Sequence, residues 1–214
     1  EEQRDNLDDD SFAPSTLDAV TSHTASNVID PSGGSNAYKI TPTTASAFHH
    51  NTKSFTVVDA TVYTYSFYIK PDGYDYILVN AHVGNAAGNA GPIFNLATGQ
   101  QQGYSTADHP TTVTECKNGW FRVSTQYTTS GTTLTIDHNI LPSTTVGVYA
   151  GDGSSGILYW GSQLEAGSFP TSLMPSCGDP PCRAADIVSV TGTNFSRFFR
   201  ETGGTFVADI QVQK

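Results

Sequence analysis

The stretch VYTYSFYIKPDGYDYILVNAHV, residues 62–83, alternates apolar and polar side chains on both sides of a Pro-Asp-Gly turn. Successive side chains of a β-strand point to opposite faces, so every second residue from Tyr63 to Ile69 shares one apolar face. The residues from Ile77 to Val83 repeat this pattern after the turn. Proline, aspartate and glycine are favoured in tight turns, which predicts a hairpin between the two strands. The stretch therefore predicts a sheet with one buried face.

Short runs of the same kind, separated by turn residues, continue along most of the chain. No helical period of useful length occurs, and the charged share of only 14% suits strands and turns better than long helices. We expect an all-β fold, an antiparallel β-sandwich of the jelly-roll type. The predicted strands are residues 37–40, 53–57, 62–70, 75–83, 92–96, 112–116, 120–128, 132–137, 145–149 and 156–165.

The chain divides into four predicted parts. Residues 1–26 form an irregular acidic N-terminal segment, and residues 27–176 form the jelly-roll sandwich. Residues 177–186 form a linker, in which Cys177 and Cys182 are candidates for a small disulfide loop around Gly-Asp-Pro-Pro. Cys116 is left over and is expected to be buried and inert. Residues 187–214 form the first strands of a second lectin-like β domain, too short to fold alone.

The acidic charge balance excludes two classes of partner. The formal net charge is −10, with only 10 lysines and arginines. Nucleic acids and anionic membranes both need a basic surface, so neither is an expected partner. No apolar run approaches the roughly 20 residues that a membrane-spanning helix needs.

The faces opposite the apolar ones carry polar and aromatic side chains together. Sugars present C–H faces that stack on aromatic rings, and hydroxyl groups that pair with amide, guanidinium and imidazole groups. If one sheet is concave, these side chains would form a glycan-binding groove. The alternatives are a solvated outer face or a subunit interface, and Trp120 also fits a core position. The glycan-binding candidates are Tyr68, Lys70, Asn80, His82, Trp120, Arg122 and Gln126.

The sequence predicts no catalytic site and no metal site. Asp137-His138 has no nucleophile elbow such as Gly-x-Ser-x-Gly to partner it. His49 and His50 are adjacent, so in a strand they point to opposite faces and cannot share a metal simply. The Asp8–Asp10 run offers oxygen ligands for a structural calcium ion but lacks the spacing of an EF-hand loop, and a solvated acidic tail is the favoured interpretation.

Several motifs together resemble a module that recurs in tail-fibre, tailspike and other virion proteins of tailed bacteriophages. The first is the run GILYWGSQLEAG at 156–167, followed by Pro-Thr-Ser at 170–172 and Cys-Arg-Ala-Ala-Asp at 182–186. Tyr-Thr-Tyr-Ser-Phe-Tyr-Ile-Lys at 63–70 and Asn-Gly-Trp-Phe-Arg at 118–122 also fit. Leu173-Met174 and the Cys-Gly-Asp-Pro-Pro-Cys insert depart from the usual pattern.

The resemblance implies a concanavalin-like or carbohydrate-binding-module-like jelly roll on a virus particle. Such modules bind host-surface polysaccharide or build the fibre, and they share no catalytic motif. The expected partners are other virion proteins and further copies of the chain, with a trimer favoured. The alternatives are a purely structural virion protein, such as a head fibre, decoration or tail adaptor, and an accessory module of a polysaccharide depolymerase. Gln163 and Glu165 are then expected to end the closing strand and to tie the exit loop through side-chain hydrogen bonds.

Overall fold

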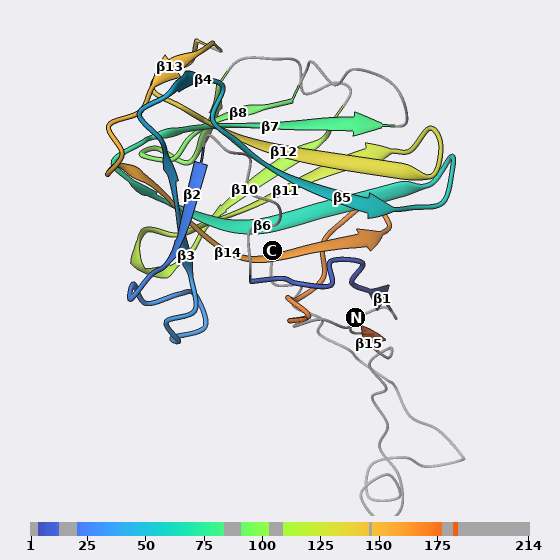
Figure 1. Ribbon diagram of the computed structural model, residues 1–214. Coiled ribbons are helices and arrows are strands. Elements are labelled where there is room, and N and C mark those ends of the chain that lie inside the picture. Colours follow the sequence, from blue (N-terminus) through green and yellow to red (C-terminus); the bar gives the residue numbers. More distant parts are fainter. Residues whose placement is uncertain are drawn as a thin grey trace, which may run out of the picture.

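The computed structural model describes residues 4–12, 21–83, 91–102, 109–145, 147–176 and 182–183, and these form a sandwich of two antiparallel sheets (Figure 1). This confirms the predicted all-β, jelly-roll-type fold. The described residues contain no helix long and apolar enough to cross a bilayer. One sheet has six strands, in the order β10 (Thr111–Glu115), β11 (Phe121–Thr128), β6 (Val62–Asp72), β14 (Gly156–Ala166), β3 (Tyr38–Pro42) and β2 (Thr21–Ala25).

The second sheet has five strands, and two short ribbons complete the described structure. Its order is β5 (His50–Thr56), β12 (Thr133–Leu141), β7 (Tyr76–Val83), β8 (Ile93–Asn95) and β9 (Gln100–Gln102). The ribbons pair β4 (Ser46–Ala47) with β13 (Tyr149–Ala150), and β1 (Arg4–Asp5) with β15 (Cys182–Arg183). A single 3-10 turn, η1 (Lys117–Gly119), joins β10 to β11.

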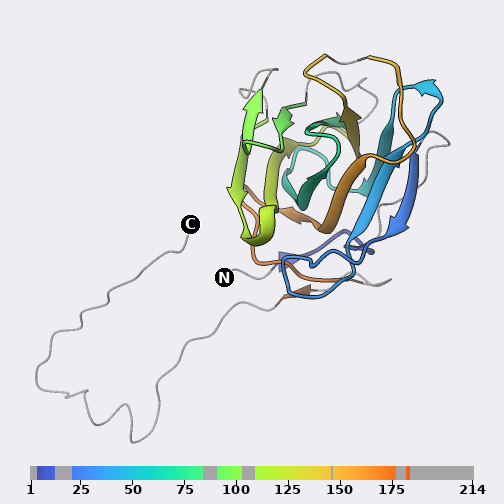
Figure 2. The ribbon, with the colours of Figure 1, turned by 90° about the vertical axis from the view of Figure 1, so that its left-hand side faces the viewer.

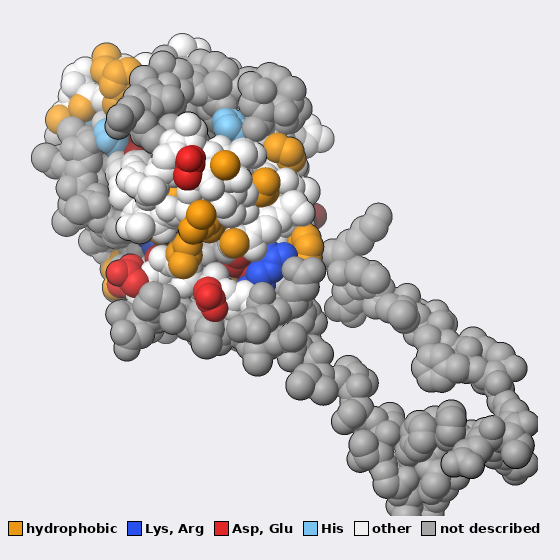
Figure 3. Space-filling view, turned by 90° about the vertical axis from the view of Figure 1, so that its right-hand side faces the viewer, with side chains coloured by type: hydrophobic (Ala, Val, Ile, Leu, Met, Phe, Trp, Pro, Cys, Tyr) orange, Lys and Arg blue, Asp and Glu red, His pale blue; other side chains and the backbone are white. Residues whose placement is uncertain are grey.

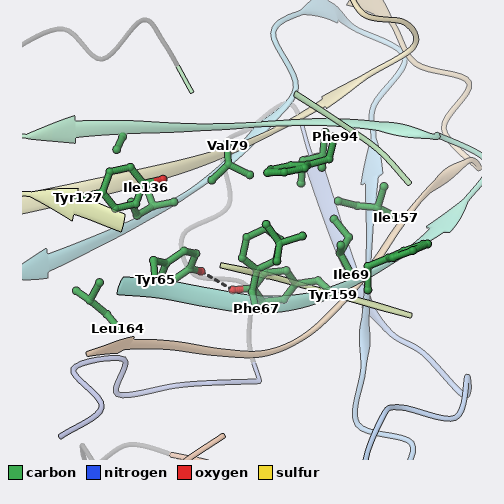
Figure 4. Close-up of a cluster of buried hydrophobic side chains, with 14 of the residues drawn as sticks. Tyr65, Phe67, Ile69, Val79, Phe94, Tyr127, Ile136, Ile157, Tyr159 and Leu164 are labelled. Atoms are coloured by element: carbon green, nitrogen blue, oxygen red, sulfur yellow. Dashed lines mark hydrogen bonds between the residues drawn. The ribbon is translucent and has the colours of Figure 1, made fainter. Parts of the chain in front are cut away.

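The core lies between the two sheets and is built from the apolar faces that the sequence predicts. Tyr65, Phe67 and Ile69 of β6 face Ile77 and Val79 of β7, and none of these five is exposed. Figure 4 shows Tyr65 and Tyr159 meeting through their hydroxyl groups, 2.8 Å apart. Burying one such side chain stabilises the fold by about 1.5–3 kcal/mol. Period-two alternation therefore identified the inward faces of β6 and β7.

One predicted connection is wrong. The turn at Pro71-Asp72-Gly73 does not close a hairpin, because β6 belongs to the six-stranded sheet and β7 to the five-stranded sheet. Gly73 takes a φ of 106°, and the chain crosses from one layer to the other there. Turn residues specify a change of direction, and the pairing partner depends on the rest of the sandwich. At Asn118-Gly119 the turn does join paired neighbours, β10 and β11.

A β-bulge in β14 changes which side chains face the core. The register with β6 shifts between Trp160 and Gln163, where Gly161 takes a φ of 62°. Tyr159 faces the core and Trp160 the opposite side, as their spacing predicts. The extra residue lets Leu164 return to the core while Gln163 points outward.

The sandwich begins earlier than the predicted boundary at residue 27. β2 belongs to the six-stranded sheet, and residues 4–12 lie against β14, with hydrogen bonds from Leu7 to Leu164 and from Ser162 to Ser11. The dark blue N-terminal segment and the orange segment around β15 lie together along the lower edge of the sandwich (Figure 2). Asp8 is 2% exposed, so the interpretation of the Asp8–Asp10 run as a solvated tail is wrong for Asp8. Residues 187–214 lie outside the described part of the chain.

Candidate functional site

The segment that leaves the sandwich, residues 171–176, covers part of the outer face of the six-stranded sheet. Gln163 and Glu165 are fully buried there. Both Glu165 oxygens accept hydrogen bonds from Thr171, from its hydroxyl group at 2.6 Å and its backbone N–H at 3.0 Å. Gln163 accepts one from the Met174 backbone N–H at 2.9 Å. The predicted tie between the closing strand and the exit loop is confirmed, and this carboxylate is structural.

Three of the glycan-binding candidates are held by the exit segment or by the loop between β2 and β3. Trp120 is fully buried, and its indole N–H donates to the Ile29 carbonyl at 2.9 Å. Arg122 donates to the Thr171 carbonyl at 2.6 Å, with its guanidinium group 5.5 Å from the Tyr68 ring centroid. Tyr68 packs edge-on against Trp160 at 5.1 Å. These side chains fix loops onto the sheet, so they do not line a groove.

Lys70 and Gln126 lie on the same sheet face but nearer its rim. Lys70 donates from Nζ to the Asn118 carbonyl at 2.8 Å, in an exposed contact beside the β10–β11 turn. Gln126 is half-buried near the end of β11, opposite Thr64 of β6. The face between them holds Ser66 and Ser124, both buried. The structure therefore brings five of the seven candidates onto one face, where Trp120, Arg122 and Tyr68 are held by loops and Lys70 and Gln126 are partly exposed.

The outer face of the five-stranded sheet carries the other two candidates in a different setting. The register places six polar side chains in two rows of three across β5, β12 and β7, which we call the polar grid. Ser54 is exposed, and the other five are half-buried. The first row is Thr52, Asp137 and Asn80, and the second row is Ser54, Thr135 and His82.

Hydrogen bonds order the polar grid. Asp137 accepts from the Thr52 hydroxyl at 2.7 Å on one oxygen, and its other oxygen lies 2.7 Å from Nε2 of His82. Ser54 and Thr135 share a hydrogen bond at 2.9 Å. These contacts set the orientation of the imidazole ring on the sheet surface, with about a third of the His82 side chain exposed at 35%. A pre-oriented polar group loses less entropy on binding a ligand.

Apolar side chains are exposed beside the β4–β13 ribbon. The β4–β13 ribbon stands at the upper left of the sandwich, on the side of the five-stranded sheet (Figure 1). Phe48 and Val148 are adjacent to its paired residues and are 48% and 60% exposed. Behind them the Tyr149 ring lies 4.6 Å from the His49 ring and 5.9 Å from the Tyr74 ring. Phe48 and His49 thus lie beside the β4–β13 ribbon, just before the start of β5.

The polar grid contains residues that the sequence interpretation did not select. Thr52, Ser54, Thr135 and Asp137 share a face with Asn80 and His82 only because β5 and β7 both pair with β12. Their alternation with Leu134 and Ile136 was a usable signal for the outward face. Which strands are neighbours is a tertiary property, so the sequence alone could not unite the six.

The cysteines and the acidic run that the sequence singled out do not form a catalytic or metal site among the described residues. Cys116 is a free, half-buried thiol, and burial raises its pKa, so it stays protonated and weakly nucleophilic. Among the described residues no group of three or more His, Cys, Asp or Glu side chains could hold a metal ion. Both carboxylate oxygens of Asp8 accept hydrogen bonds from Lys53, which leaves this residue poorly placed for calcium. The candidate Cys177–Cys182 loop lies outside the described residues, because Cys177 is not among them.

Comparisons with known proteins add only a distant structural likeness. No protein-family model matches the sequence, and no curated protein matches it. Among solved structures, the chain is similar to one titled "CBM4 structure and function", with a TM-score of 0.37 and 16% identity. That match covers 62% of this chain and 72% of the other. A likeness at this level does not define a function, so function has to be inferred from the polar grid.

Proposed function

We propose that this domain is a non-catalytic module that binds an uncharged polysaccharide on the outer face of its five-stranded sheet. The observation that carries the proposal is the hydrogen-bonded chain from Thr52 through Asp137 to His82, which links the two rows of the polar grid. Neighbouring strands place polar groups about 5 Å apart, and alternate residues of one strand about 7 Å apart. A sugar ring lying on the sheet can therefore meet several donors and acceptors at once.

The charge of the face favours a neutral sugar. The outward positions of the five strands hold no lysine or arginine, and Asp137 is their single carboxylate. Acidic polysaccharides need cationic partners, and the net charge of −10 repels them further.

The same single carboxylate argues for binding without hydrolysis. Glycosidases that use the common mechanism need two carboxyl groups facing each other across the bond that is cleaved. Asp137 has one oxygen occupied by Thr52 and the other by His82. We therefore assign Asp137 to positioning the imidazole ring.

Binding is tested by titrating the protein with a panel of neutral and acidic polysaccharides in a calorimeter. We expect saturable binding to at least one neutral polymer, reduced ten-fold or more by His82→Ala, a loss of about 1.4 kcal/mol. The matched control is Lys70→Ala, a candidate on the opposite sheet, which should bind as the wild type does. Binding that Lys70→Ala removes and His82→Ala leaves intact would place the site on the other face. No saturable binding to any neutral polymer would overturn the proposal.

A second candidate function is a building block of a bacteriophage virion, as the sequence resemblance implies. One observation favours it: the segments entering and leaving the sandwich are held side by side by the β1–β15 ribbon and by a hydrogen bond from Asn6 to the Met174 carbonyl. A domain whose chain enters and leaves at one edge can be attached to a fibre or a particle through that edge. Figure 3 shows hydrophobic side chains on one end of the sandwich. Val58 and Val62 are exposed, at 65% and 38%.

The two candidates differ in measurable behaviour. A virion module of the fibre type is expected to form a trimer and to bind other virion proteins. If the module has both functions, its polysaccharide ligand is expected to lie on the host surface. Light scattering coupled to size-exclusion chromatography measures the oligomeric state. A monomer at all accessible concentrations that still binds a polysaccharide would favour an independent binding module.

A further inference from the structure

A lysine and an aspartate meet inside the sandwich, away from the polar grid. Lys53 points inward from β5, and its Nζ lies 2.9 and 2.7 Å from the two carboxylate oxygens of Asp8. The two side chains are 3% and 2% exposed. Asp8 belongs to the N-terminal segment, so this contact joins that segment to the five-stranded sheet. Neither glycan binding nor the resemblance to virion modules requires such a contact.

Burying this ion pair is costly. Each charge loses several kcal/mol of hydration, which the attraction between the two charges only partly offsets. A neutral link between the same two atoms would keep the geometry and remove both charges. We propose that Lys53 and Asp8 condense to an intramolecular isopeptide bond, which ties the N-terminal segment covalently to β5.

The reaction balances without any further reactant. Nζ of Lys53 attacks Cγ of Asp8, a C–N bond forms, and one C–O bond of the carboxyl group breaks. The ammonium group gives up two of its three protons, and both leave with the departing oxygen as one water molecule. The product is a secondary amide between Lys53 and Asp8, and no oxidation or reduction takes place.

Burial prepares Asp8 for this step. It raises the pKa of the Asp8 carboxyl group, although the charge and hydrogen bonds of Lys53 oppose the shift. Burial also lowers the pKa of Lys53, but Tyr159 and Asp8 raise it by more, so the resting state is the ion pair. The reactive amine and carboxylic acid carry the same total number of protons as that pair. A proton transfer between the two groups is therefore sufficient to start the reaction.

The neighbours of the pair hold it in place and polarise it. The Ser162 hydroxyl donates to Oδ2 of Asp8, which draws electron density from the carboxyl carbon. Lys53 also contacts the Ser162 hydroxyl at 2.9 Å and the Asp10 carbonyl at 2.8 Å, which restricts the motion of Nζ. Groups held together in this way react as if at very high concentration.

A route for the released water lies beside the pair. A cavity of about 50 Å³ adjoins it, large enough for one or two water molecules. The lining residues are Asp8, Asp9, Asp10, Lys53, Ser54 and Phe55. The Tyr159 ring covers another side, with its centroid 5.9 Å from Nζ.

The proposal is tested by intact mass spectrometry of the unfolded full chain, followed by peptide mapping. We expect a mass one water below the sequence mass, and a branched tryptic peptide that joins residues 5–39 to residues 40–117. Mapping is essential because Glu1, or the Asp-Gly pairs at 72–73 and 152–153, can lose a water by cyclisation. The loss must be located at Lys53 and Asp8.

Three variants control the measurement. Lys53→Met and Lys53→Arg should both restore the full mass, and the second keeps the positive charge so that loss of the fold is not the explanation. Lys39→Met should keep the loss of one water, because Lys39 pairs with Asp72 at 2.5 Å and takes no part in the bond. This variant lacks the tryptic site after residue 39, so its linked product is a single peptide of residues 5–117 that is uncut after Lys53 and carries an internal bridge. Complete cleavage after Lys53, with no branched peptide after prolonged incubation at acidic, neutral and basic pH, would overturn the proposal.

Discussion

The carboxylate of Glu165 shows how one residue can decide the course of a loop. It is fully buried, and it accepts hydrogen bonds from Gln163, from the Thr171 hydroxyl group and from the Thr171 backbone N–H. In the sequence it could have been one half of a catalytic pair. Its partners in the fold are an amide, a hydroxyl and a backbone group, so it acts as an anchor for the exit loop.

Replacing this anchor should be costly. Glu165→Ala leaves the Thr171 and Gln163 donors buried without their acceptor, so we expect the free energy of unfolding to fall by about 3 kcal/mol. Urea denaturation measures the change. Glu115→Ala is the matched control, because Glu115 is exposed at the end of β10, and it should change the stability by less than about 0.5 kcal/mol. Equal losses for the two variants would contradict the anchoring role.

At the scale of elements, the bulge in β14 is the feature on which several others depend. It sends Leu164 into the core and points Gln163 and Glu165 toward the exit loop. It also lets Ser162 reach Lys53 and Asp8. Gly161 makes this possible, because its φ of 62° is a conformation that residues with a side chain rarely adopt.

A methyl group at this position should disturb the bulge. In Gly161→Ala the new Cβ would lie 2.9 Å from Cδ2 of Leu173 and 3.1 Å from Cδ2 of Tyr68, in a strained backbone conformation. We expect a loss of about 1–3 kcal/mol in thermal or urea unfolding. Gly147→Ala is the control, since a Cβ there would meet nothing within 4 Å and no positive φ is involved. A stability equal to that of the control would show that β14 tolerates a regular strand here.

At the scale of the whole molecule, the interior of the sandwich is unusually rich in titratable groups. His138 is fully buried among Tyr65, Phe67 and Tyr159, with its ring centroid 4.8 Å from that of Phe67. Burial, with a further contribution from the charge of Lys53, lowers its pKa to about 3. The folded protein therefore keeps this imidazole neutral at pH values where the unfolded chain protonates it.

This difference predicts an acid sensitivity with a definite sign. Below the ordinary pKa of 6.5 the unfolded chain binds one more proton at His138 than the folded chain does. As the pH falls from 6.5 toward the folded pKa of about 3, the free energy of unfolding should therefore fall by up to about 1.4 kcal/mol for each pH unit. His138→Phe removes this contribution, so its stability should depend less on pH than that of the wild type. Parallel pH curves for the two proteins in urea denaturation would contradict the burial of the imidazole.

Part of this organisation was readable in the sequence. Alternation identified Tyr65, Phe67, Ile77 and Val79 as core residues, because the two-residue period of a strand is a local property of the backbone. The end of the closing strand was also predicted, since Gln163 and Glu165 stand just before an exit loop with a proline. The hairpin at 71–73 was predicted wrongly, because a turn sequence does not specify the sheet that the next strand joins.

The sequence by itself determined the fold class and the inward face of each strand, because both follow from residue type and spacing along a single strand. Only the tertiary structure decided which outward face stays accessible. Residues 171–176 cover the six-stranded sheet over Tyr68 and Arg122, while Thr52, Asp137 and His82 remain together on the other sheet. Residues 4–12 run along β14 and bring Asp8 to Lys53. Contacts between distant segments depend on how the layers close, and no local pattern encodes that closure.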